Sequence, residues 1–341
     1  MPDYRRFLLP VLYLSLALVS GVSVLQYTAQ QFPWDFTINW VAAQGMRQGI
    51  SLYAHDELRN LSLSLVGPHG ATLFQDTYTS YIGLPSTALL MQPFTLLPFA
   101  DAVTVYQVAL LIAFGTSVYL TGLALPPESR VIGWVVGAVA LRLFHPVLFS
   151  VGLGQVDALV MLSLAIGLLA ASKQRWWLAG MGIGVAALLK VSPVLLILYL
   201  LLKGKHQAVA GALLTALLLL SLSAVGGRAD DLLIFARDVA PSLSAGSLHI
   251  QNQSLPGWLA RLLSPETDLL TFTHGLGPSS LLGLPSAVAV TIAFYLKTRQ
   301  REPASLDYGF LILVALLAGP ITWDHYTSWA VLPLILLCNT R

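Results

Sequence analysis

The sequence contains few charged residues. Asp, Glu, Lys and Arg make up 10% of its 341 residues, whereas a typical soluble domain carries about 25%. Hydrophobic residues make up 56%, which is more than a folded domain of this length can bury while it keeps a wettable exterior. These two values exclude a water-soluble globular protein, so lipid must be the solvent for much of the surface.

Other absences narrow the possible functions. A single cysteine, Cys338, excludes an intrachain disulfide and a CxxC zinc site. The net charge is only +2, and no basic stripe with interleaved aromatic residues indicates nucleic acid. The sequence has no Walker loop, no strand-bounded GxGxxG and no DxD pair, so we expect neither a cofactor nor a metal. Any transfer reaction must therefore use a donor other than ATP or a nucleotide sugar, which favours a lipid-linked donor.

Long apolar runs predict an all-helical integral membrane protein of about ten segments, forming a single membrane domain over residues 1–341. The first run, from Phe7 to about Tyr27, follows two arginines and is interpreted as a signal anchor that stays in the protein. Two long outer loops are expected at about 28–101 and 227–279. The remaining runs are 85–99, 102–124, 131–150, 156–172, 176–202, 207–225, 280–296, 308–322 and 326–338. Three prolines interrupt the run 85–99, so we expect it to be interfacial or re-entrant.

Lys190-Val191-Ser192-Pro193 interrupts the run 176–202, and loop charges decide how this run crosses the membrane. If the run is a hairpin, eleven Lys and Arg residues lie on the cytoplasmic side and five on the opposite side. A single pass would move five of those eleven outside and remove the asymmetry. Cytoplasmic loops collect Lys and Arg, so the sequence predicts a hairpin with both long loops outside.

Two charged residues lie where charge is costly. A lysine at membrane depth costs at least about 2.5–3.5 kcal/mol, and Lys190 adjoins a Ser-Pro break that frees backbone amides. This combination favours an anion site, although an interfacial lysine that reaches the headgroups is the alternative. Asp35 lies among aromatic residues near the membrane surface, where partial desolvation would make it a useful base. The alternative for Asp35 is a turn or helix-capping residue.

Weaker polar motifs fall on the same predicted side of the membrane. Gln155 follows a glycine at an outer turn, and Asn252 and Gln253 lie in the second long loop. Trp323 and His325 interrupt an apolar run near the C-terminus, where a helix-breaking loop with a capping aspartate is the simpler interpretation.

At these residues the sequence resembles glycosyltransferase family 87, the polyprenol-phosphate-mannose-dependent mannosyltransferases with the GT-C membrane fold. The resemblance covers nearly the whole chain in order. It is carried by Asp35 with Gly49-x-x-x-Tyr53, Tyr81 to Pro98, Gly154-Gln155, Gly180 through Lys190 to Pro193, Asn252-x-Ser254 and Pro320-x-x-Trp323-x-His325.

This resemblance implies an inverting transfer of a mannosyl or other hexosyl residue from a polyprenyl-phosphate donor to a glycolipid or glycan hydroxyl. Asp35 would be the general base, and Lys190 with His325 would bind the donor phosphate. Sugar or acceptor binding would fall to Gln155, Asn252, Gln253 and Trp323. The implied location is a multi-pass plasma or inner membrane protein, in contact with membrane lipids, with its site on the periplasmic or extracytoplasmic side.

Two alternatives remain open at the level of sequence. A transporter or flippase of lipid-linked sugars would also place charges and broken helices in the membrane, usually in paired repeats. The sequence shows no matching halves around its two broken segments. An inactive assembly subunit would share every motif named above.

Overall fold

The computed structural model describes residues 31–75, 80–225, 229–264, 280 and 282–339, together with single positions between 11 and 28. Most of the predicted anchor, Phe7 to Tyr27, and residues 265–279 of the second loop lie outside the described residues. Within the described part every named element is helical, which confirms the predicted all-helical class. Its only strand-like feature is an isolated antiparallel bridge between Asn252 and Trp323.

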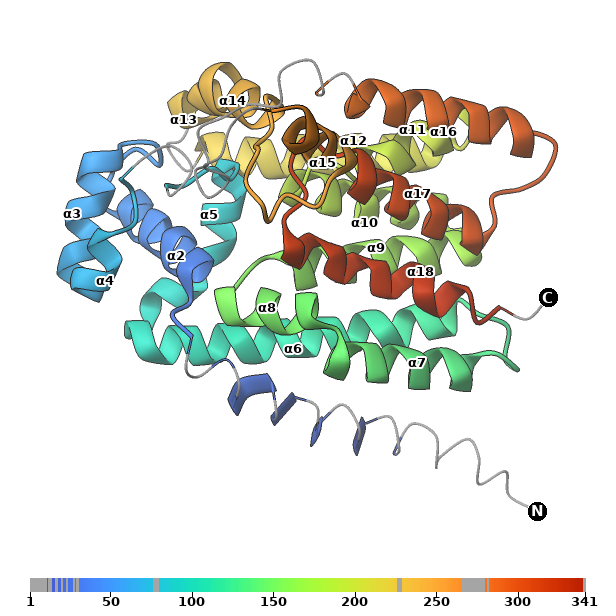
Figure 1. Ribbon diagram of the computed structural model, residues 1–341, viewed down its shortest axis with the longest axis horizontal. Helices are drawn as coiled ribbons and strands as arrows, with labels where there is room; N and C mark the ends of the chain where they lie inside the picture. The colour runs from blue at the N-terminus through green and yellow to red at the C-terminus, as the bar shows by residue number, and fades with distance from the viewer. Residues whose placement is uncertain are drawn as a thin grey trace.

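Most of the apolar helices run side by side along the long axis of the molecule (Figure 1). They are α6 (Phe99–Leu123), α7 (Arg130–Leu143), α8 (His145–Leu153), α9 (Asp157–Ser172), α10 (Trp176–Leu189), α11 (Val194–Leu202), α12 (His206–Ser223), α16 (Leu284–Thr298), α17 (Ser305–Ala318) and α18 (Val331–Leu336). Of the described helices, α6 and α12 are long and apolar enough to cross a bilayer, and α7 with α8 adds a third if the pair forms one span. The predicted count of about ten segments, the GT-C fold and the single-domain organisation stay predictions.

Shorter helices occupy the two predicted loops. They are α2 (Trp34–Arg47), α3 (His55–Val66), α4 (Pro68–Ala71), α5 (Pro85–Met91), η1 (Gln92–Leu96), α13 (Ala229–Ile234), η3 (Phe235–Val239), α14 (Ala240–Ser244) and α15 (Leu255–Leu263), and η5 (Asp324–Ala330) precedes α18. Helices α2 to α5, α13 and α14 gather at one end of the bundle (Figure 1). The proline-rich run 85–99 is broken as predicted, because α5 changes to the 3-10 helix η1 and α6 begins after Pro98.

The predicted span 131–150 contains a bend that the sequence analysis did not anticipate. We expected 131–150 to be a single segment, but α7 and α8 meet at an angle of 59°. Phe144 between them is extended, with φ −84° and ψ 105°. Pro146 in the first turn of α8 has no N–H with which to continue the ladder of α7, so the chain turns instead of crossing straight.

The run 176–202 folds back on itself at Lys190, as predicted. Helix α10 ends at Leu189, Lys190 is extended, and α11 begins at Val194. The two ends of the run meet, because the Lys205 ammonium lies 4.5 Å from the centre of the Trp176 ring. Lys205 also pairs with Glu302 at 2.5 Å, so the loops after α11 and α16 share one end of the molecule.

Small residues bring α10 and α12 into close contact. A Cβ added to Gly180 would lie 1.8 Å from the carbonyl oxygen of Ala208, and one added to Gly211 would lie 2.4 Å from that of Trp177. Helices in a membrane gain little from apolar burial against each other and associate by such close packing. This close packing against α12 fixes the position of α10, which ends immediately before Lys190.

We predict that Gly180→Ala lowers the thermal unfolding temperature of the detergent-solubilised protein. The added methyl group must push α12 away or strain α10, and overpacking of this kind costs about 1–3 kcal/mol. Leu178→Met is the matched control, because Leu178 is 45% exposed on the same helix. Equal unfolding temperatures for the two variants would contradict the close contact.

Candidate active site

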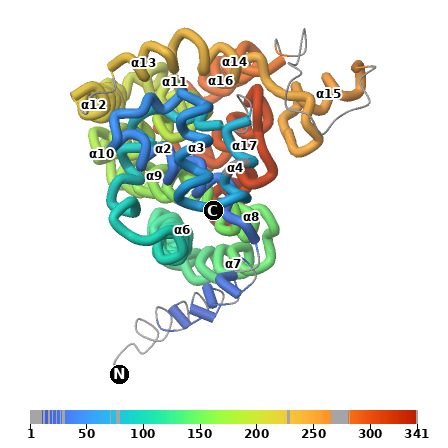
Figure 2. The backbone as a smooth tube through the Cα atoms, turned by 90° about the vertical axis from the view of Figure 1, so that its left-hand side faces the viewer, coloured from blue at the N-terminus to red at the C-terminus, as the bar shows by residue number. Residues whose placement is uncertain are grey.

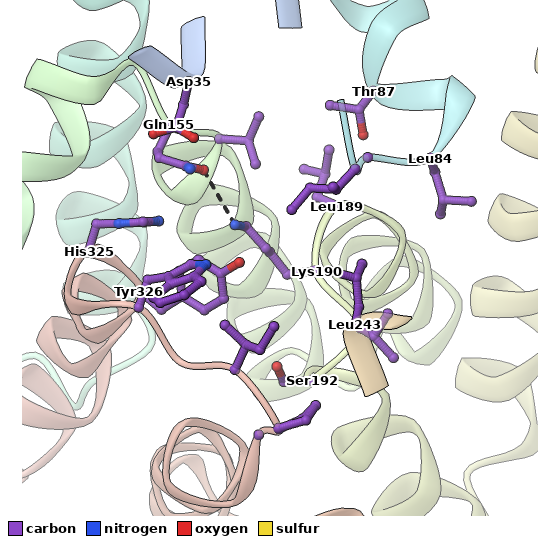
Figure 3. Close-up of a pocket in the computed structure, with 18 of the residues that line it drawn as sticks. Asp35, Leu84, Thr87, Gln155, Leu189, Lys190, Ser192, Leu243, His325 and Tyr326 are labelled. Carbon is purple, nitrogen blue, oxygen red and sulfur yellow. Dashed lines mark hydrogen bonds between the residues drawn. The ribbon is translucent and has the colours of Figure 1, made fainter. Parts of the chain in front are cut away.

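A cavity of about 970 Å³ opens where the bundle meets the short helices. Asp35, Gln155, Lys190, Trp323 and His325 all line it. Five of the seven residues predicted from sequence thus come together, from segments that are far apart along the chain. Figure 3 shows Asp35 and Gln155 on one side of the cavity, Lys190 near its centre, and His325 beside Tyr326.

Asp35 is placed by the aromatic packing of α2. It lies in the first turn of that helix, and the next residue, Phe36, is fully buried with its ring 5.1 Å from that of Tyr106 on α6. One turn later Trp40 donates its indole N–H to the Phe94 carbonyl at 3.0 Å. These contacts fix the start of α2, so the carboxyl group is enclosed by protein while part of its surface faces the cavity.

Gly154 brings Gln155 up to α2. It ends α8 in the left-handed conformation, with φ 71° and ψ 41°, which glycine adopts without steric cost. A Cβ at this position would also lie 2.4 Å from Cβ of Phe36. Only glycine therefore permits this approach, and it is the physical reason for the Gly-Gln pair seen in the sequence.

Lys190 reaches the cavity because α10 stops one residue before it. Its backbone is extended, with φ −148° and ψ 124°, which turns the side chain away from the helix axis. The ammonium donates to Oε1 of Gln155 at 3.3 Å and lies 3.6 Å above the centre of the Tyr326 ring. A lysine has three N–H donors, and Gln155 and Tyr326 engage two of them, so one is left with which it can bind an anion.

Burial raises the pKa of Asp35 to about 6. The positive charge of Lys190 and a hydrogen bond with Gln155 favour the carboxylate and offset part of this rise, whereas the charge of Asp157 adds to it. A carboxyl group with a pKa near 6 is largely ionised at neutral pH and is still a much better proton acceptor than an ordinary aspartate.

His325 lies close to Asp157 but does not form a hydrogen bond with it. Its Nε2 is 3.9 Å from Oδ2 of Asp157, which is too far for one. Burial, followed by the positive charge of Lys190, lowers the pKa of His325 well below its ordinary value. The imidazole is therefore neutral near pH 7 and can bind a ligand only as a neutral hydrogen-bonding group.

Asn252 and Gln253 do not line the cavity. Asn252 is fully buried, and its amide group donates to the carbonyls of Ser247 and Pro320 at 2.8 and 3.0 Å. Its Oδ1 accepts from the backbone N–H of Thr322 at 2.9 Å. The Gln253 backbone N–H donates to the Thr322 carbonyl at 2.6 Å. Both residues hold the second loop against 320–322, so a direct contact with sugar stays an untested prediction that this geometry does not favour.

Sequence reasoning gave no role to Tyr326, although the motif ending at His325 adjoins it. Its ring carries the Lys190 ammonium and stacks on Trp329 at 5.6 Å with the planes 10° apart. Apolar residues that line the cavity far from Asp35 were also missed. They come from α11, α14, α16 and α17 and include Leu195, Leu243, Ala287, Ala315 and Ala318.

We predict that Lys190→Met raises the pKa of Asp35 above 6, because it removes the positive charge that favours the carboxylate. Infrared titration of the protonated carboxyl band, assigned by its loss in Asp35→Asn, measures this pKa. Lys173→Met is the control, because Lys173 is exposed at the turn between α9 and α10. An unchanged or lower pKa in Lys190→Met would contradict the arrangement.

Comparison with known proteins gives a family match. A sequence model described as "Glycosyltransferase family 87" matches residues 81–320. His325 lies five residues beyond the matched range, whereas Asp35 lies 46 residues before it. No solved structure matches.

Three curated relatives come from mycobacteria. Two are polyprenol-phosphate-mannose-dependent alpha-(1-2)-phosphatidylinositol pentamannoside mannosyltransferases, from Mycobacterium tuberculosis (27% identical, covering 72% of this chain and 56% of the relative) and Mycolicibacterium smegmatis (28%, 72% and 58%). The third, a phosphatidylinositol mannoside mannosyltransferase with the same donor from Mycobacterium tuberculosis, is 26% identical over 96% of this chain and 76% of the relative. The chain thus spans a little over half the length of the first two relatives.

Proposed function

Because the chain belongs to glycosyltransferase family 87, we propose that it transfers a mannosyl residue from a polyprenyl-phosphate donor to a glycolipid hydroxyl, with inversion at the sugar carbon. The observation that carries this proposal is one cavity in which a carboxyl group with a raised pKa faces a lysine ammonium. The names of the relatives specify this donor and phosphatidylinositol mannoside acceptors, so such a glycolipid is the first acceptor to test.

The proposed reaction needs one base and one cation. Asp35 takes the proton of the acceptor hydroxyl as its oxygen attacks the anomeric carbon from the face opposite the phosphate. The bond to the phosphate breaks with its electron pair, and the positive charge and remaining N–H donor of Lys190 stabilise the negative charge that grows on the leaving group. A glycosidase needs a second carboxyl group as an acid, but a phosphate leaves without being protonated.

The rest of the cavity suits a lipid-linked donor. Its wall between α11, α16 and α17 is apolar and includes the small side chains of Ala287, Ala315 and Ala318, so it suits isoprenoid units next to the phosphate site. Near Asp35 the wall is more polar, with Gln31, Asn39 and Thr87 available to an acceptor sugar. Gln155 touches both charged groups, and neutral His325 and Trp323 flank the sugar position.

We further propose that the cavity opens on the extracytoplasmic side of a cell membrane. The support is the clustering of basic loops at the opposite end of the bundle, where Lys203 donates to the Arg301 carbonyl at 2.7 Å and Lys205 pairs with Glu302. Loops rich in Lys and Arg stay in the cytoplasm. On the extracytoplasmic side a lipid-linked donor delivers the sugar without a nucleotide, which agrees with the absence of nucleotide motifs from the sequence.

Asp35→Asn is expected to lower the rate of mannosyl transfer by about 10²–10⁴-fold, the usual contribution of a general base. The measurement is transfer of labelled mannose from polyprenyl-phosphate-mannose to extracted glycolipid in membranes. Asp56→Asn, an exposed aspartate in the same predicted loop, should keep the wild-type rate. Wild-type turnover in Asp35→Asn would remove Asp35 from the mechanism.

The rate of transfer should also depend on pH. A base must be ionised to act, and the pKa of Asp35 is about 6, so the rate rises as the pH increases through about 6 and levels off above it. Initial rates between pH 5 and 8, at donor concentrations well below KM so that they report the pKa of the free enzyme, test this dependence. A rate that is constant across that range, with chemistry limiting, would argue against Asp35 as the base.

A further inference from the structure

Helix α15 in the second predicted loop exposes large apolar side chains and buries small ones. Its exposed side chains are all large and apolar: Leu255 (51% exposed), Trp258 (54%), Leu262 (62%) and Leu263 (71%). Its buried residues are the small Pro256, Gly257 and Ala260, whereas Leu259 and Arg261 are half-buried. A helix that packs on a protein in water has the opposite arrangement, with its large apolar side chains inside.

The exposed residues form a continuous stripe. Leu255, Trp258 and Leu262 are spaced by three and four positions, so they lie one above the other on one helix face. In water each square ångström of this apolar surface would cost about 25 cal/mol. The stripe therefore indicates that something apolar covers α15 in the native environment.

We propose that the headgroup region of the membrane leaflet at the cavity end of the bundle covers this face and that α15 is an interfacial helix. The buried side of α15 adjoins the start of the apolar helix α16, because a Cβ on Gly283 would lie 3.7 Å from Pro256, and the next residue, Leu284, is itself apolar and 57% exposed. Helix α15 lies at the edge of the bundle and across its long helices (Figure 2). Tryptophan is enriched at the level of the lipid headgroups, and a helix lying in the interface buries its apolar face there.

The same helix is rigidly joined to the rim of the cavity. The Ser254 hydroxyl caps α15 by accepting from the Gly257 N–H at 3.1 Å. Asn252 Oδ1 accepts from the backbone N–H groups of both Ser254 and Thr322, at 3.2 and 2.9 Å. Because Pro320, Ile321 and Trp323 line the cavity, one buried amide group links the membrane-facing helix to the cavity wall.

The consequence for function rests on the proposed glycolipid acceptor, whereas the placement of α15 does not. A helix fixed in the interface holds the rim of the cavity at the level of the headgroups. An acceptor whose lipid chains stay in the leaflet then presents its sugars at the height of Asp35, without leaving the membrane.

The test places a fluorophore on the exposed face. In a Cys338→Ser background, Trp258→Cys and, as an independent second site, Leu262→Cys are labelled with bimane in the full-length protein. The labelled protein is reconstituted into vesicles of phosphatidylcholine and phosphatidylglycerol, with lipids brominated near the headgroup end or near the chain end. Glu57→Cys on α3, which is exposed, is the control for a water-facing site, and Leu217→Cys on α12, 66% exposed, is the control for the membrane interior.

We expect both α15 labels to lose fluorescence most strongly with bromines near the headgroup end and to resist aqueous iodide. Leu217→Cys should respond most to bromines near the chain end, and Glu57→Cys should respond to iodide alone. Quenching of the α15 labels by iodide, with no response to brominated lipid, would overturn the proposal. Protection from both quenchers would overturn it as well, because a second copy of the chain or another protein would then cover α15. Neither result depends on whether the protein transfers mannose.

Discussion

The position of the Lys190 ammonium is the constraint on which the cavity depends. A charge inside a bundle of apolar helices is tolerated only with polar or aromatic partners. For Lys190 the partners are the Gln155 amide oxygen and the face of the Tyr326 ring. Helix α10 must end at Leu189 to present this side chain, and the same break returns the chain as α11. The hairpin, the cavity and the charge inside it therefore have a single structural origin.

Asp35 and Lys190 influence each other without neutralising each other. A carboxylate in direct contact with an ammonium group has its pKa lowered, yet for Asp35 the effect of burial is larger and the pKa rises to about 6. Gln155 interacts with both groups, so an amide lies where an ion pair would otherwise form. That spacing leaves the carboxylate able to accept a proton and the ammonium able to bind an anion, and the proposed transfer from a sugar phosphate requires both.

The sequence was sufficient to predict the break at Lys190 and the hairpin, because a charge or a helix break inside an apolar run has a large free-energy cost and is easily recognised in the sequence. A lysine and a Ser-Pro pair inside an apolar run indicate a break, and the bias of loop charges indicates a reversal. The 59° bend between α7 and α8 was missed because His145-Pro146 lies near the end of a run that is otherwise long enough to span. The buried, backbone-bonded position of Asn252 could not be predicted, because an amide in a loop gives no sign of which backbone groups it will bind. Its partners near residue 320 are distant in sequence, and only the folded chain brings them together.

The groups proposed for chemistry all lie at helix ends: Asp35 begins α2, Gln155 precedes α9, Lys190 follows α10 and His325 is in the first turn of η5. The reason is physical. Inside a membrane, backbone groups outside a helix need partners, so irregular segments persist only where protein buries them or where they line a polar cavity. Where several helix breaks come together, their polar groups can hydrogen-bond to one another, as the side-chain oxygen of Asn252 accepts a hydrogen bond from the backbone N–H of Thr322. The fold thus assembles polar side chains and non-helical backbone around a cavity, where lipid does not exclude them.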